Sequence, residues 1–161
     1  MRKKQSAEKV AKRPDKSTSV KLDTGPLATS IGFALRMASF ATTQRFHEAM
    51  RAFDLRPAQF GTLVLIAANP GVRQRDLSEA LRIEKANFAG LLDNLERRNL
   101  VERRSEPEDR RRYAIHLTRD GQGLLRRACR AHDRMEAGFQ KLLPARATKQ
   151  FLANLARITV E

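Results

Sequence analysis

Cysteine, tryptophan and long apolar segments are all scarce in this sequence. Of its 161 residues one is cysteine, Cys129, and none is tryptophan. A single cysteine forms no disulfide within the chain, which favours a reducing compartment. No apolar run approaches the roughly 20 residues of a membrane-spanning helix, and no apolar segment follows the basic N-terminus as it would in a secretory signal. We therefore expect a cytoplasmic protein that does not contact membranes.

The residue patterns of common enzymes and metal sites are also missing. The histidines, His47, His116 and His132, are scattered, and the segment after His47 lacks the second histidine of a zinc-hydrolase helix. Gly121-Gln122-Gly123 lacks both the downstream glycine and the βαβ context of a dinucleotide site. No cysteine pair is available for structural zinc. We expect no enzymatic activity, no metal and no cofactor.

Acidic residues are few relative to basic ones. Lys and Arg number 32 and Asp and Glu 18, which gives a formal charge of +14 and a pI near 11.1. Such a charge favours a polyanionic partner, and nucleic acid is favoured over a membrane surface because no long basic amphipathic helix is evident. Residues 1–24 are basic and poor in apolar side chains. They predict a flexible tail, either a solvated extension or an arm that contacts DNA phosphate.

The remainder, 25–161, has enough apolar residues for a core and alternates between two kinds of spacing. Helical spacing is found over 27–53, 57–67, 74–81, 84–98, 119–143 and 151–158, and strand-like composition or alternation over 100–104 and 112–117. The polar segment between the strands, 105–111, is predicted to be the tip of a hairpin. The first helix is apolar on more than one side, so we expect a partner subunit to cover it. The fold class is mainly α (α+β).

The order of helix, tight turn, helix and basic hairpin is that of a winged helix-turn-helix. In this module the second helix places its N-terminal residues against base edges in the major groove. Helix 84–98 suits that role, because Phe88, Leu91, Leu92 and Leu95 share one face. The opposite face presents Lys85, Ala86, Asn87, Gly90, Asn94 and Arg97.

Side chains on that opposite face have the chemistry needed to distinguish bases. Lys85 can donate to guanine and Asn87 can pair with the N6/N7 edge of adenine. The small residues Ala86 and Gly90 let the backbone approach DNA closely. The alternative is an ordinary solvated helix face.

Arginine is concentrated in the hairpin and at the helix end before it. We assign to the DNA backbone or the minor groove the residues Arg97, Arg103, Arg104, Arg110 and Arg111. A narrow minor groove attracts arginine through its strong negative potential. The alternative is a solvated, charged loop.

Several segments, taken in order, resemble the MarR family of bacterial transcription regulators. They are Asp76-Leu77-Ser78-Glu79-Ala80-Leu81, the stretch 91–104, Pro107-Glu108-Asp109-Arg110-Arg111 and Leu117-Thr118-Arg119-Asp120-Gly121. The resemblance implies a MarR-type domain over 25–161, in which dimerisation helices (25–55 and 119–161) flank a winged helix-turn-helix (57–118). It also implies a homodimeric repressor that a small effector releases. Two positions depart from the family pattern: Arg56 stands at the usual threonine cap, and Asn99 at the usual glycine.

The resemblance further places the effector between the dimerisation helices and the winged module. We expect Arg36, Ser39, Phe40 and Arg56 to contact it, since arginine donates in pairs to a carboxylate and an aromatic ring can stack. For Arg36 a salt bridge within the dimer is the alternative. The expected effector is an aromatic acid or its CoA thioester, whose phosphates would need surface arginines. Cys129 is predicted to be a packed thiol rather than a redox sensor.

Together these features predict a homodimeric, sequence-specific DNA-binding regulator, a repressor that acts on a pseudo-palindromic operator. One alternative is a non-specific architectural nucleic-acid-binding protein, which the charge alone would also support. The other is a ligand-binding protein or enzyme that reuses the fold, for which the sequence offers no catalytic constellation.

Overall fold

Helices make up most of the chain, as the apolar spacing predicts. The structure, a computed structural model, describes residues 22–106 and 109–160, without the side chains of 106–112 and 160. The tail predicted over 1–24 falls outside the described residues except for 22–24. The elements, with η for a 3-10 helix, are η1 (Gly25–Thr29), α1 (Ile31–Met50), η2 (Arg51–Phe53), α2 (Pro57–Ala68), β1 (Val72–Arg73), α3 (Gln74–Ala80), α4 (Lys85–Arg97), β2 (Val101–Glu106), β3 (Asp109–Leu117), α5 (Arg119–Gln140) and α6 (Ala145–Val160).

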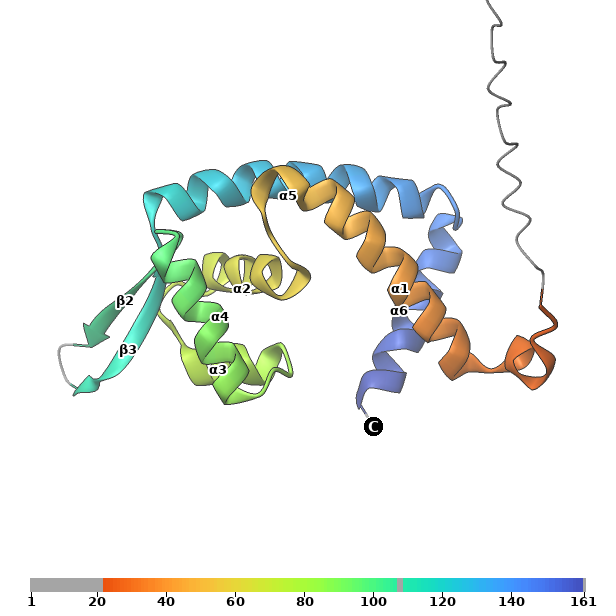
Figure 1. Cartoon of the computed structure of the whole chain (residues 1–161), viewed down its shortest axis with the longest axis horizontal. Helices are drawn as coiled ribbons and strands as arrows, with labels where there is room; N and C mark the ends of the chain where they lie inside the picture. Colours follow the sequence, from red (N-terminus) through yellow and green to blue (C-terminus); the bar gives the residue numbers. More distant parts are fainter. Residues whose placement is uncertain (1–21, 107–108, 161) are drawn as a thin grey trace, which may run out of the picture.

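The longest helix, α5, spans the molecule along one edge (Figure 1). Below its N-terminal end lie α2, α3, α4 and the β2–β3 hairpin. At its other end the chain folds back as α6, which crosses α1 in this view. The C-terminal part of α1 packs against α5. The predicted winged helix-turn-helix with flanking helices is therefore confirmed.

The sheet has three antiparallel strands in the order β1-β3-β2, one strand more than the sequence predicts. Strand β1 pairs Val72 with Ile115 and Arg73 with Ala114. The predicted hairpin tip at 105–111 is wrong in extent, because β2 continues to Glu106 and β3 begins at Asp109. Backbone pairing extends this far because the ladder needs no particular side chain.

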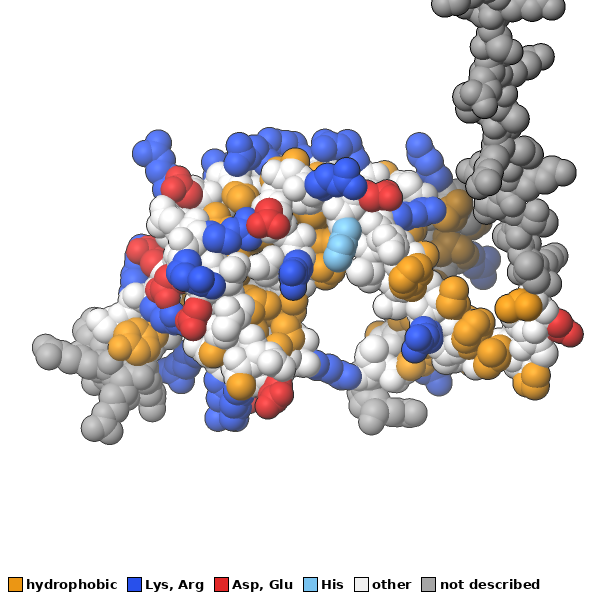
Figure 2. Space-filling model, viewed as in Figure 1, with side chains coloured by type: hydrophobic (Ala, Val, Ile, Leu, Met, Phe, Trp, Pro, Cys, Tyr) orange, Lys and Arg blue, Asp and Glu red, His pale blue; other side chains and the backbone are white. Residues whose placement is uncertain are grey.

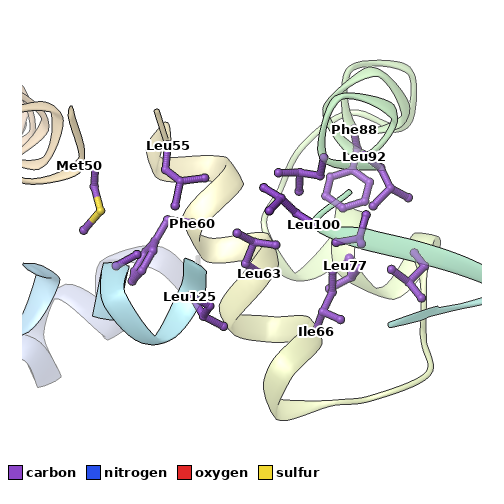
Figure 3. Packing of buried hydrophobic residues seen from close by; sticks show 14 of the residues in the cluster. Met50, Leu55, Phe60, Leu63, Ile66, Leu77, Phe88, Leu92, Leu100 and Leu125 are labelled. Carbon is purple, nitrogen blue, oxygen red and sulfur yellow. The ribbon is translucent and has the colours of Figure 1, made fainter. Parts of the chain in front are cut away.

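One hydrophobic core holds the winged module together (Figure 3). From α4, Phe88, Leu92 and Leu95 are each 0% exposed. They lie among buried side chains of α2, α3 and the sheet, namely Leu63, Ile66, Leu77, Leu100, Val101 and Ile115. Burying a side chain of this size contributes about 1.5–3 kcal/mol, so the core fixes which face of α4 turns outward.

The apolar spacing over 74–81 predicts that Leu77, Ala80 and Leu81 lie on the inward face of α3, and one of these three needs correction. Leu77 is buried and Leu81 half-buried, but Ala80 is exposed because α3 ends at that residue. Ser78 is buried in its place, and its hydroxyl donates to the carbonyl of Arg75 at 2.8 Å. The local hydrogen bond allows a polar side chain to be buried at this position.

Large apolar side chains remain exposed at the end of the molecule away from the wing (Figure 2). They belong to η1, to the first half of α1 and to α6 with the turn before it: Leu27, Ile31, Met37, Phe40, Leu142, Leu143, Phe151, Leu152 and Ile158. An apolar surface of this kind marks a protein–protein contact. Across the described ranges, no helix has the length and apolar character needed to cross a membrane.

Candidate nucleic-acid interface

The outward face of α4 is exposed and makes few contacts within the protein. Lys85, Ala86, Asn87, Gly90 and Arg97 are all exposed. The Asn87 amide lies 3.5 Å from a carboxylate oxygen of Glu84, the residue before the helix, which is at the limit of a hydrogen bond. A Cβ atom built on Gly90 would meet no atom within 4 Å. Packing within the chain therefore does not require glycine there, whereas close approach of an outside molecule would.

Asn94, also predicted on this face, is turned partly into the protein. It is half-buried, and its Oδ1 accepts a hydrogen bond from Gln59 Nε2 at 2.9 Å. Gln59 Oε1 in turn accepts from the backbone N–H of Arg56 at 2.9 Å. A guanidinium has no acceptor, so the side chain of Arg56 cannot cap α2, and the hydrogen bond to Gln59 satisfies only the backbone N–H of Arg56. The Gln59 side chain joins α2 to α4.

Asn99 ends α4 in the left-handed conformation expected for it, with φ of 54°. The N–H groups of Asn99 and Leu100 donate to the carbonyls of Glu96 (2.8 Å) and Leu95 (3.0 Å). This is the hydrogen-bond pattern of a Schellman motif, which satisfies the last carbonyls of the helix. Asparagine thus adopts the left-handed conformation at a position where the family that this sequence resembles usually has glycine.

The end of α4 is joined directly to the start of α5, and we call this the α4–α5 joint (Asn99, Leu100, Thr118, Asp120 and Gly121). Thr118 caps α5 by accepting from the Gly121 N–H at 2.9 Å, and its hydroxyl donates to the Asn99 carbonyl at 2.6 Å. The Asn99 amide donates to Asp120 Oδ2 at 2.8 Å. A Cβ on Gly121 would lie 1.9 Å from the Leu100 carbonyl oxygen, so only glycine fits.

The wing is fixed to α4 through Arg103. Its guanidinium forms ion pairs with Asp93, at 2.6 Å, and with Glu96, and its side chain is 23% exposed. Arg104 is exposed and forms an ion pair with its neighbour Glu102. Both arginines are on β2, but Arg103 is held against the helix and Arg104 lies at the surface. For Arg110 and Arg111 the structure describes the backbone of β3 and not the side chains.

Arg98 holds the other side of α4 and was missed as a structural residue. It donates to the backbone carbonyls of Asp54 (2.8 Å) and Phe53 (2.9 Å), in the connection between α1 and α2. When several arginines are close in sequence, the sequence does not indicate which of their side chains will bind to the protein's own backbone. The consequence is that α4 is anchored on both flanks.

The residues predicted to contact an effector do not line either of the two cavities described for this chain. Arg36, Ser39 and Phe40 are exposed on α1, and Arg56 is exposed at the start of α2. A cavity of about 440 Å³ lies instead between α1 and α5, lined by Arg45, Glu48, Ala49, Ala131, Arg134, Met135 and Gly138. Arg45 also lies over the ring of Phe139, 4.9 Å from its centre.

Next to this cavity, α1, α2 and α5 meet through aromatic rings. His132 stacks on Phe60 with ring centres 4.9 Å apart, and Phe46 contacts both rings edge-on. Neither the cavity nor the stack was predicted, because their residues come from helices far apart in the sequence.

Cys129 is half-buried on α5. Burial raises the pKa of its thiol above the ordinary value, and the negative charge of Asp133 adds to the effect. A raised pKa keeps the group as the unreactive thiol at neutral pH. The position agrees with a packed thiol.

Known proteins share this sequence and geometry. The MarR family model matches residues 53–112. The chain is 31% identical over 132 residues to the regulatory protein assigned to the hcr operon of Thauera aromatica, and the match covers 81% of this chain and 80% of that protein.

Two solved structures of the transcriptional repressor CouR have the same fold. One is bound to a 23-mer DNA duplex; it is 35% identical with a TM-score of 0.82, covering 86% of this chain and 99% of that chain. The other is bound to p-coumaroyl-CoA; it is 33% identical with a TM-score of 0.80, covering 88% and 99%. The fold is a winged helix-turn-helix with an exposed α4, and the chain is similar to known regulators over most of their length. The chain therefore belongs to the MarR family of transcriptional regulators.

Proposed function

We propose that this protein is a homodimeric repressor that binds a pseudo-palindromic operator in the cytoplasm and is released by a small effector. The observation that carries the proposal is the division of α4 into two faces. Phe88, Leu92 and Leu95 are fully buried, while Lys85 and Asn87 near the N-terminus of the helix are exposed. This is the orientation in which a recognition helix meets base edges. The similar protein CouR has been solved bound to a 23-mer DNA duplex, which supports DNA binding.

Within this proposal the predicted residues have different tasks. Lys85 and Asn87 contact base edges, and Ala86 and Gly90 allow the helix backbone to come close. Arg97 and Arg104, both exposed, contact phosphates, together with Arg110 and Arg111 of the wing. Asn94 and Arg103 already have partners within the protein, so we assign them first to holding α4 and the wing in position.

The exposed apolar side chains of α1 and α6 supply the dimer contact. Ile31, Phe40 and Leu152 are 69%, 62% and 59% exposed in the single chain. Burying them against a second copy places one α4 on each side of a two-fold axis. Recognition helices then enter successive major grooves with half-site centres roughly 34–36 Å apart.

For the effector we propose an aromatic acid or its CoA thioester, bound between α1 and α5. The cavity there has the positive charges of Arg45 and Arg134 and the apolar wall of Ala49, Ala131 and Met135. A carboxylate or thioester carbonyl can accept from a guanidinium while a ring packs on the apolar wall. The p-coumaroyl-CoA complex of CouR supports this class. Arg36, Ser39 and Phe40 on α1, and Arg56 at the start of α2, stay predicted contacts.

Selection from a random duplex library, followed by gel shifts at fixed salt, tests the DNA-binding proposal. A specific regulator should prefer its selected site by roughly a thousandfold or more over unselected DNA. Equal binding to all sequences would instead establish the non-specific architectural alternative.

The effector proposal is tested on the complex with the selected site. p-Coumaroyl-CoA and free p-coumarate are each added, and release of DNA is followed together with the melting temperature, which a ligand of the folded dimer raises. Product analysis after incubation distinguishes a regulator from an enzyme. Turnover without DNA binding would overturn the proposal.

A further inference from the structure

A second cavity, unconnected with the predicted sites, lies along the first half of α5. It has a volume of about 560 Å³ and is lined by Leu100, Asp120, Gly123, Leu124 and four arginines, Arg119, Arg126, Arg127 and Arg130. We call it the α5 groove. Figures 1 and 2 show that α5 forms the edge of the molecule opposite α3 and α4, and that Lys and Arg side chains gather along that edge.

The α5 groove carries more positive than negative charge, because its lining holds four arginines and one carboxylate, Asp120. All four arginines are exposed, and the side chain of none of them forms a hydrogen bond or ion pair with a described residue. The one acidic residue of the lining, Asp120, accepts from Asn99. Arg126 and Arg130 are four residues apart on the helix, and like charges at this spacing destabilise it. An anionic ligand would remove that repulsion.

The shape and lining of the groove restrict the class of anion. Guanidinium groups bind phosphate oxygens in pairs, and several of them converge on a space of the size that small-molecule sites have. Leu100, Leu124 and Gly123 add an apolar part to the lining. A Cβ atom on Gly123 would meet only the far end of Arg126, at 3.9 Å. We propose that the α5 groove binds the phosphate groups of a nucleotide-containing small molecule.

The groove also includes part of the α4–α5 joint. Leu100 and Asp120 line it, and Asp120 holds Asn99 at the end of α4. A phosphate drawn to Arg119 therefore adds charge beside the hydrogen bonds that support the recognition helix. Binding in the groove and binding of DNA are then coupled, and by linkage each changes the affinity for the other. This coupling, unlike the site itself, rests on the proposed function.

Two sources supply the same phosphate chemistry: the nucleotide part of a CoA thioester effector, and a free nucleotide. Titration calorimetry of the full chain with coenzyme A, p-coumaroyl-CoA, ATP and p-coumarate separates them. We expect the phosphate ligands to bind. Tighter binding of coenzyme A than of ATP would identify the thioester as the source, and the reverse order a free nucleotide.

The decisive variant is Arg126→Gln with Arg130→Gln, and its control is Arg51→Gln with Arg146→Gln, which removes the same charge from exposed sites elsewhere. The groove variant should bind phosphate ligands about tenfold more weakly or worse, because each guanidinium donates charge-assisted hydrogen bonds. Its affinity for p-coumarate and its melting temperature should not fall. The control should match the wild type.

Three results would overturn the proposal: no binding of coenzyme A or ATP to the wild type, equal losses in both variants, or weaker DNA binding by the groove variant without ligand. The last would show that the α5 groove contacts the DNA backbone. The titrations with phosphate ligands do not depend on operator specificity. A failure of the proposed function, which the gel shifts would show, can therefore be distinguished from a failure of the α5 groove proposal.

Discussion

Among single residues, Asn87 is the side chain best placed to distinguish bases. It is exposed on the first turn of α4, and a bidentate amide contact to adenine contributes to discrimination between base pairs. Asn87→Ala should cost about 1–3 kcal/mol on the selected site and relax the preference at one position. Gel shifts on single-base variants of the site measure both. Gln122→Ala, exposed on α5, is the control; an unchanged base preference for Asn87→Ala would remove this residue from base contact.

At Gly90, a substitution should affect DNA binding and protein stability in opposite directions. Its position inside α4 is open, with no atom within 4 Å of an added Cβ. Gly90→Ala should therefore raise stability by up to about 1 kcal/mol, since glycine is a poor helix former. Its DNA affinity should fall, because the new methyl group stands between helix and duplex. Urea unfolding and gel shifts on one preparation make the comparison, and unchanged affinity would place Gly90 outside the contact.

At the scale of elements, the α4–α5 joint tolerates no side chain at Gly121. A Cβ there would lie 1.9 Å from the Leu100 carbonyl oxygen, whereas at Gly123 the nearest atom is 3.9 Å away. Gly121→Ala should lower the free energy of unfolding by about 1–3 kcal/mol or more. Gly123→Ala, two positions along the same helix, should be neutral or stabilising. Equal stability of the two variants in urea would contradict the close contact.

Arg103 and Arg104 are neighbours on β2 with different tasks. Arg103 pairs with Asp93 and Glu96 of α4, so Arg103→Ala should cost about 1 kcal/mol of stability and weaken binding through the position of the wing. Arg104→Ala should leave stability unchanged and reduce the slope of log affinity against log salt by about 1, the effect of one lost phosphate contact. A reduced slope for Arg103→Ala instead would make Arg103 a direct phosphate contact.

The sequence predicts those elements whose signal is local. The spacing of Phe88, Leu92 and Leu95 predicts α4, and Asn99 its end, because helix period and left-handed backbone are properties of neighbouring residues. Strand β1 was missed because two residues carry no periodicity and form a strand only against Ile115 and Ala114.

The same distinction applies to the candidate sites. The exposed face of α4 can be predicted from the residue spacing within that one helix. The ion pairs of Arg103 and the cavity between Arg45 and Arg134 need elements brought together by folding. The effector residues suggested by the family resemblance consequently differ from the residues that line the cavity between α1 and α5.

For the whole molecule, the exposed apolar side chains of α6 should decide the oligomeric state. Leu152 is 59% exposed, and a charge there would be buried without a partner in a dimer, at a cost of several kcal/mol. Leu152→Glu should sediment as a monomer and lose operator affinity. Tyr113→Glu, 52% exposed on the wing, should stay dimeric. Unchanged sedimentation of Leu152→Glu would place the dimer contact elsewhere.

The far end of α6 also returns to the winged module. Arg82, in the left-handed conformation at the turn between α3 and α4, donates to the carbonyl of Thr159 near the end of α6. Together with α5 this contact closes a ring through the whole chain, with the opening visible in Figure 2 at its centre. The contact between Arg82 and Thr159 is one hydrogen bond, which contributes about 1 kcal/mol. It therefore breaks more easily than the continuous helix α5 bends. We therefore expect the spacing between the two recognition helices of a dimer to change at the tip of α6, with α5 as the pivot.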